Sequence, residues 1–148
     1  MEKRGFSVLS SKGIRAEQQL ARLLRDRHYS VTRSAGSRGP MDIIAHKEKL
    51  FGLVKKKFGI QVKATRETES NLEKKEIENL QRAARSAGFE PVLAVRFGGE
   101  KWRFWREEPE DIVEETDFEY LLDKYKNRPS ILLQVNDPRA KLLENVFS

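Results

Sequence analysis

Two polar residues on a short apolar stretch constrain this chain more than any other feature. Residues 59–63 read Gly-Ile-Gln-Val-Lys, and successive side chains of a β-strand point to opposite faces of the sheet. Ile60 and Val62 are therefore predicted to face one way, and Gln61 and Lys63 the other. An amide beside an ammonium is a poor way to build a hydrophobic core, so this strand is predicted to present a polar site.

A carboxylate lies upstream of that strand. Asp42 precedes Gln61 by nineteen residues and follows a turn-forming segment at 36–40. An aspartate close to an amide and a lysine can hold a divalent cation and a water molecule against a phosphate. The pattern therefore predicts a metal-dependent site for phosphate chemistry, formed by Asp42, Gln61 and Lys63.

Helical periodicity adds a second carboxylate. Residues 11–27 are predicted to form a helix with Ser11 as its N-cap. At about 100° per residue, Glu17 falls in the middle of the apolar stripe of this helix. The stripe residues are Ile14, Leu20, Ala21 and Leu24. Because an ionised carboxylate on a buried face is costly unless it is paired or bound to metal, Glu17 either belongs to the site, pairs with an arginine such as Arg33, or lies at the rim of the stripe.

The order of apolar patterns and turn signals predicts an α/β protein. The core elements are a helix at 11–27, strands at 29–33, 41–45 and 61–63, a helix at 73–87 ended by Gly88, and strands at 91–97 and 102–106. Residues 50–54 form either a strand or the apolar part of a hairpin, residues 55–57 a turn or an exposed edge, and residues 64–72 a flexible segment. The tail is predicted to hold a helix near 118–125, a strand near 131–135 and a helix opened by Asp137-Pro138. This order indicates a mixed sheet with a helix on each side.

Charge is distributed unevenly along the chain. Residues 1–70 carry 16 Lys and Arg against 7 Asp and Glu, whereas residues 71–148 carry 13 against 16. A basic half that contains the candidate site suits a polyanion such as DNA, although a basic surface can also serve solubility alone. Residues 107–119 hold eight acidic and no basic residues, which indicates a solvated face or a patch that repels DNA.

Composition also excludes several classes of protein. The chain has no cysteine, so disulfides, thiolate metal sites and cysteine nucleophiles are excluded. No apolar run approaches the ~20 residues that a membrane-spanning helix needs, and the N-terminus lacks the apolar core of a signal peptide. We therefore expect a soluble, intracellular protein of the cytoplasm that has no membrane partner.

Six stretches of the chain carry a family pattern. They are Lys12-Gly13 with Glu17, residues 31–37, Asp42, residues 60–63, residues 91–97 and residues 102–104. Together they resemble the archaeal-type Holliday junction resolvases of the wider PD-(D/E)XK nuclease superfamily. The resemblance implies a restriction-endonuclease-like fold, with a mixed central β-sheet flanked by helices. It also divides the single domain of 148 residues into a basic N-terminal arm (1–10), a catalytic core (11–106) and a C-terminal extension (107–148).

The resemblance implies a function and a set of roles. The chain would be a structure-selective endonuclease that uses Mg²⁺ or Mn²⁺ and works as a homodimer to cut opposed strands of a four-way DNA junction. Glu17, Asp42, Gln61 and the Val62 carbonyl would bind the metal, and Lys63 would orient or activate the attacking water. The resemblance also implies that Arg33 and Ser37 contact the phosphate backbone near the cut, and Arg38 beside them is an expected DNA-binding residue. Charge alone adds Lys3, Arg4 and Lys12 of the arm and Lys55, Lys56 and Lys57, for which a solvated surface is the alternative.

One residue departs from the family pattern. The resolvases it resembles usually have glutamate where this chain has Gln61, which keeps one carbonyl oxygen but loses the charge. Gln61 is either a natural ligand, as in the Mrr-type nucleases that carry Gln-X-Lys, or an engineered substitution that stops cleavage. Two alternatives to a resolvase follow: another PD-(D/E)XK DNA endonuclease, such as an Mrr-like enzyme, or a junction-binding protein inactivated at Gln61.

Overall fold

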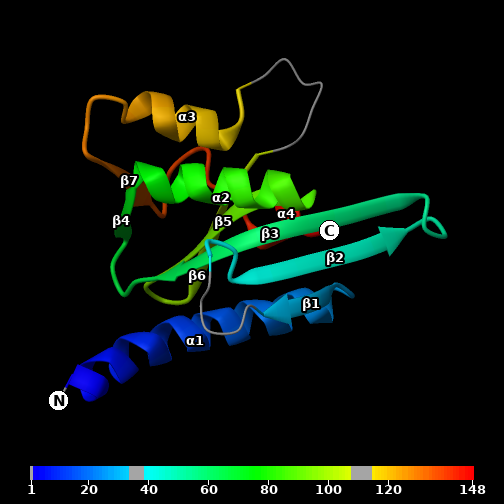
Figure 1. Cartoon of the computed structure of the whole chain (residues 1–148), viewed down its shortest axis with the longest axis horizontal. Helices are drawn as coiled ribbons and strands as arrows, with labels where there is room; N and C mark the ends of the chain where they lie inside the picture. Colours follow the sequence, from blue (N-terminus) through cyan, green and yellow to red (C-terminus); the bar gives the residue numbers. More distant parts are fainter. Residues whose placement is uncertain (1, 34–38, 108–114) are drawn as a thin grey trace.

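A mixed five-stranded sheet forms the centre of the protein (Figure 1). The computed structural model describes residues 2–33, 39–107 and 115–148, and residues 2–12 only by their backbone. The strands, in spatial order, are β1 (Ser30–Arg33), β2 (Ile43–Lys49), β3 (Val54–Ala64), β5 (Glu90–Phe97) and β6 (Lys101–Arg106). β3 and β5 pair in parallel, and the other neighbours pair antiparallel. The parallel pair requires a crossover connection, which helix α2 (Lys74–Ala87) supplies.

Helices cover both faces of this sheet, as the sequence predicts (Figure 1). Helix α1 (Glu2–Asp26) packs against one face, and α2 and α3 (Asp117–Lys124) pack against the other. Side chains of β5 alternate between the two cores: Val92 and Ala94 join the α1 side, whereas Leu93 and Val95 join the α2 side. The near-continuous burial of β5 is the pattern expected of a strand that is covered on both faces.

Helix α1 begins earlier than the sequence analysis predicts. Its backbone is helical from Glu2, so Ser11 lies inside the helix and is not its N-cap, and residues 2–10 form the first part of α1. The physical reason is that no proline interrupts residues 2–12, and extending an existing helix is far less costly than nucleating one. Within the described part of the stripe, Ile14 is 44% exposed, whereas Leu20, Ala21 and Leu24 are fully buried.

The β2–β3 hairpin is longer than predicted. Lys49 pairs with Val54 and Ile43 with Ile60, so Lys55, Lys56 and Lys57 belong to strand β3 and do not form a turn. Strand β5 pairs with β3 only from Phe58 onward, so these three lysines lie on an edge, as the other alternative predicted. The chain reverses instead at residues 50–53, where the Leu53 N–H donates to the Leu50 carbonyl. Because the reversal occurs there, the three lysines continue the ladder with β2.

A second, two-stranded sheet was not expected. β4 (Glu69–Glu73) pairs antiparallel with β7 (Ser130–Gln134), so the prediction of a flexible segment at 64–72 is wrong for its second half. The partner strand comes from the tail, about sixty residues later. The tail contains the predicted helix (α3) and the predicted strand (β7), but Asp137-Pro138 opens no helix because the Asp137 carboxylate accepts from the Arg139 N–H and so forms a turn.

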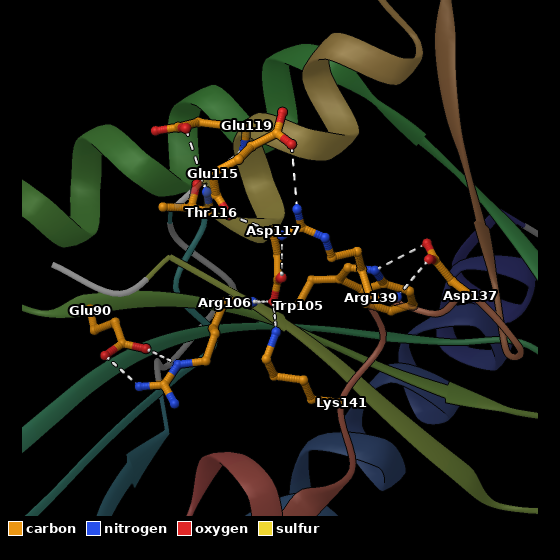
Figure 2. Close-up of polar contacts among 10 residues, drawn as sticks. All are labelled: Glu90, Trp105, Arg106, Glu115, Thr116, Asp117, Glu119, Asp137, Arg139 and Lys141. Carbon is orange, nitrogen blue, oxygen red and sulfur yellow. Dashed lines mark hydrogen bonds and ion pairs between the residues drawn. The ribbon is translucent and has the colours of Figure 1, made fainter. Parts of the chain in front are cut away.

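A buried carboxylate fixes the tail to the central sheet (Figure 2). Asp117, 3% exposed, accepts a hydrogen bond from the Arg106 N–H at the end of β6 and forms ion pairs with Arg139 and Lys141. Glu107 is also buried and pairs with Arg85 of α2. For these two residues the prediction of a solvated acidic face is wrong, because each carboxylate is buried and paired with basic side chains from other elements.

The end of the tail contributes to the other core. Beyond the short helix α4 (Leu143–Val146), Phe147 is fully buried on the α1 side of the sheet. Its ring lies 4.9 Å from that of Phe58, 5.4 Å from that of Phe104 and 5.8 Å from that of Tyr29, centroid to centroid. The tail therefore supplies side chains to both cores. Among the described helices, none has the length and apolar character needed to cross a membrane.

Candidate active site

The candidate site lies at the point where β2 begins and β3 continues past it. Asp42 extends the β2–β3 ladder by one bond, since its N–H donates to the Ile60 carbonyl at 2.8 Å. Its side chain makes the next bond to β3 in place of a main-chain carbonyl, because Oδ2 accepts a hydrogen bond from the Val62 N–H at 2.8 Å. This pairing holds the Asp42 carboxylate against the middle of β3.

Strand alternation places the other residues as predicted. Ile60 is buried in the α1-side core, with Val62 packed against that core. Gln61 lines a cleft with Glu76 and Asn79 of α2, and Lys63 forms an ion pair with Glu76 at 2.8 Å. The two polar side chains of β3 therefore face α2, and their apolar neighbours face α1.

Glu17 approaches from the opposite face, on α1. Its side chain is 14% exposed and accepts a weak hydrogen bond from Arg33 Nη2 at 3.4 Å. The ion pair between Glu17 and Arg33, one of the alternatives in the sequence analysis, is thus present. This pair does not exclude Glu17 from the site, because the charge of Glu17 also acts on the carboxyl of Asp42. Glu17 and Lys63 reach Asp42 from the two sides of the sheet.

The electrostatics of Asp42 reflect this crowded position. Burial raises the pKa of its carboxyl from 3.8 to about 6; the Val62 N–H opposes the rise, the charge of Glu17 adds to it, and the charge of Lys63 opposes it. A carboxylate whose charge is disfavoured by burial and by a second carboxylate is a site that a cation would relieve.

The oxygen donors at this edge fit a hard divalent cation. Gln61 Oε1 is buried and has no hydrogen-bond partner among the described residues, although buried amide oxygens are normally paired. The N–H and C=O of one strand residue point to the same edge, so the Val62 carbonyl faces the Asp42 side. Two carboxylates, an unpaired amide oxygen and a main-chain carbonyl are ligands of the kind that Mg²⁺ accepts. No group of three or more His, Cys, Asp or Glu side chains suited to a metal occurs among the described residues, as expected if Gln61 stands in place of a third carboxylate.

One residue of the site was missed by the sequence analysis. Glu76 pairs with Lys63, and its other oxygen accepts from the Glu73 N–H in the capping box that opens α2. The spacing of Glu73 and Glu76 could have indicated the capping box. The contact with Lys63 could not be read from the chain, because it depends on how α2 packs on β3.

The predicted DNA-binding residues are only partly described. Ser37 and Arg38 lie outside the described residues, as do the side chains of Lys3, Arg4 and Lys12. Arg33 is held at the site by Glu17, and its Nε is buried without a partner among the described groups. The remaining three, Lys55, Lys56 and Lys57, lie on β3 toward the far end of the hairpin. Their contacts with DNA stay predictions.

A mixed sheet with α1 on one face, α2 on the other and this polar edge defines the restriction-endonuclease-like class of α/β folds. Residues 9–135 match the family model described as archaeal Holliday junction resolvase (Hjc). The chain belongs to this family.

Two relatives show how far the similarity extends. The chain is 36% identical over 89 residues to the crossover junction endodeoxyribonuclease Hjc of Methanocaldococcus jannaschii, an alignment that covers 60% of this chain and 62% of that protein. The chain thus spans somewhat under two thirds of this relative's length. The structure is also similar to Hjc of Archaeoglobus fulgidus, a Holliday junction resolvase from an archaeal hyperthermophile. That match has a TM-score of 0.62 and 25% sequence identity, and covers 91% of this chain and 94% of the other.

Proposed function

We propose that this chain is a structure-selective endonuclease that resolves four-way DNA junctions by metal-dependent hydrolysis of phosphodiester bonds on opposed strands. The observation that supports this most is the position of Asp42 between Glu17 and Lys63, beside the unpaired oxygen of Gln61. Membership of the Hjc family points to the substrate. Residues 11–106 would form the catalytic core of a single domain.

The residues would divide the work as follows. Asp42, Glu17, Gln61 and the Val62 carbonyl would hold Mg²⁺ or Mn²⁺, which supplies Lewis-acid activation and charge neutralisation at the phosphate. Lys63 would orient the attacking water and offset the negative charge that develops during hydrolysis. Glu76 would fix the Lys63 ammonium through their ion pair. Arg33, held by Glu17, would contact the phosphate backbone next to the cut.

Recognition of the substrate would rest on shape and charge. Contacts to phosphates position a protein on DNA without reading bases, and the half of the chain that carries the site has a net charge of +9. Two cuts on opposed strands need two sites, so we propose that the protein acts as a twofold homodimer. A protein that processes DNA would act in the cytoplasm, which for a viral protein is the cytoplasm of its host.

The test compares cleavage of a four-way junction with cleavage of a linear duplex that has the same arm sequences, with Mg²⁺ or Mn²⁺ present. We expect metal-dependent cuts on opposed strands of the junction and much slower cutting of the duplex. Equal rates on both substrates would favour a general endonuclease of the Mrr type.

Lys63→Ala tests the assignment of the site. Cleavage should be lost while the Kd for the junction stays near that of the unmodified protein. Lys101→Ala, which removes an exposed lysine at the start of β6, is the matched control and should change neither. A parallel loss of affinity and cleavage in Lys63→Ala would mean that this lysine binds DNA and has no catalytic role.

The neutral Gln61 favours one second candidate, a junction-binding protein without cleavage activity. Hard cations prefer charged oxygen ligands, and among the described residues only the carboxylates of Glu17 and Asp42 are assigned to the metal. If the unmodified chain binds junctions but never cuts them, and Gln61→Glu creates metal-dependent cutting, this second candidate is correct.

A further inference from the structure

The tip of the β2–β3 hairpin carries large apolar side chains that are exposed in the described part of the chain. The hairpin extends past the helices on both faces, at the end of the sheet away from Asp42 (Figure 1). At its tip Leu50 is 66% exposed, Phe51 107%, Leu53 85% and Val54 38%. We call residues 50–54 the hairpin tip. A contiguous exposed apolar patch of this kind marks an interaction site more often than chance exposure does.

The turn at the tip is built from residues that do not suit it. The Leu53 N–H donates to the Leu50 carbonyl at 3.1 Å, and the two central residues, Phe51 and Gly52, have φ of 56° and 85°. Hairpin turns with positive φ at both central positions prefer Asn-Gly, and a bulky residue at positive φ is an outlier. Leu50 also has positive φ, at 54°. Neither turn geometry nor packing explains Phe51, so its side chain is available for a contact outside the chain.

The charges around the tip select the kind of partner. Residues 46–57 contain five lysines and one glutamate. Lys47 and Lys56 are tied to the body of the protein through the Arg27 carbonyl and Ser148 Oγ, whereas Lys55 and Lys57 are exposed. Burial lowers the pKa of Lys56, and the nearby charges of Lys49, Arg106 and Lys47 lower it further. A second copy of this basic tip would be repelled, and a polyanion would be attracted.

We propose that the hairpin tip is a second DNA contact, in which Phe51 and Leu53 insert into a groove of a duplex arm while Lys55 and Lys57 bind its phosphates. Apolar side chains that wedge against base steps are a known means of gripping DNA. The proposal rests on the proposed function, because it takes the DNA held at the candidate site as the DNA that the tip touches.

Strand geometry sets where this contact falls. Val54 and Gln61 are seven residues apart on β3, which at about 3.3 Å per residue is roughly 23 Å. With about 3.4 Å between base pairs along each strand, the tip meets the arm roughly seven base pairs from the cut. The tip therefore adds affinity on arms longer than that and adds none on shorter arms.

The experiment compares the Kd of Phe51→Asn with that of the unmodified protein for two junctions. One has arms of 15 base pairs, and the other has arms of five base pairs, each closed by a loop. Because asparagine suits the turn, the Tm of Phe51→Asn should stay the same or rise. Its affinity for the long-armed junction should fall about tenfold, which is the typical loss when one base–aromatic contact is removed. Affinity for the short-armed junction should not change. Phe51→Trp should keep tight binding, and Leu142→Asn, which removes an apolar side chain that is 41% exposed elsewhere, is the control for loss of exposed apolar surface.

The outcomes separate this proposal from the proposed function. Unchanged affinity of Phe51→Asn for long-armed junctions overturns the tip contact, even if the protein resolves junctions. Two further results also overturn it: dissociation of a dimer by Phe51→Asn in sedimentation, or loss of binding to phosphatidylserine vesicles with DNA binding intact. If the unmodified protein never cuts a junction but the arm-length effect of Phe51 is present, the tip contact stands and the proposed function fails.

Discussion

Replacing Asp42 by asparagine should stabilise the metal-free protein at alkaline pH while destroying its metal site. In the folded protein the carboxyl of Asp42 has a pKa of about 6 against 3.8 for the free group. Because this pKa is raised, the favourable contribution of Asp42 is complete below about pH 4 and is lost as pH rises through about 6. Above that pH the folded state holds a charge that it disfavours, and Asp42→Asn removes this charge.

The size of the effect follows from the shift. Each unit of pKa is worth about 1.4 kcal/mol, so a shift of about two units sets an upper limit near 3 kcal/mol. The side chain is not completely buried, and solvent screening lowers this to about 1–3 kcal/mol. For a domain of this size, each 1 kcal/mol moves Tm by about 2–4 °C. Asp42→Asn should therefore raise Tm by about 2–12 °C at pH 8.

Thermal unfolding between pH 4 and pH 8, with EDTA or with excess Mg²⁺, measures this. The gain of Asp42→Asn in EDTA should vanish near pH 4. Mg²⁺ should raise the Tm of the unmodified protein at pH 8 and leave that of Asp42→Asn nearly unchanged, because the proposed metal site loses the charge of one of its two carboxylates. Glu78→Gln, on an exposed position of α2, controls for the loss of one carboxylate. A variant that is less stable than the unmodified protein at pH 8 in EDTA would refute the reasoning.

Three further changes probe other parts of the structure. Gln61→Glu should lower the Mg²⁺ concentration needed for half-maximal cleavage severalfold, since a charged oxygen binds a hard cation more tightly. A metal titration of the cleavage rate measures this concentration. An unchanged midpoint would place the residue outside the metal site. Gly98→Ala should cost about 1–3 kcal/mol of stability in chemical denaturation, because the new methyl group would collide with the backbone carbonyl of Arg66. Asp117→Ala should cost about 1–3 kcal/mol, because the Arg106 N–H loses its buried acceptor and the partly exposed Lys141 ammonium loses its carboxylate. A loss below about 1 kcal/mol would show that solvent replaces these contacts.

Local periodicity was enough to predict much of the fold and the site. The alternation of Ile60, Gln61, Val62 and Lys63 determines which side chains face which layer, and this holds wherever the strand lies. Gly88 ends α2 with φ of 79°, as an isolated glycine after an apolar helical stripe indicates. Asp42 was identified because it follows a turn-forming segment and lies upstream of a strand that carries an amide and a lysine on one face.

The features that the sequence did not predict depend on contacts between distant segments. Residues 69–73 are polar, and they form a strand only because β7 pairs with them. Glu76 reads as a capping residue, and its bond to Lys63 follows from the docking of α2. The acidic residues Glu107 and Asp117 look solvated in a run of eight acids, yet arginine and lysine side chains from other elements bury them. Sequence patterns report local preferences, and these contacts are not local.

The position of Phe147 has a consequence for how the protein is made. Its ring closes an aromatic group with Tyr29, Phe58 and Phe104 on the α1 side of the sheet. The ribosome synthesises these residues in sequence order, so Phe147 is added last, after the other three. Until it arrives, this layer stays open to solvent, and the strands that carry Asp42 and Lys63 lack their full support. A nascent chain would thus complete this aromatic core only after synthesis has passed Phe147.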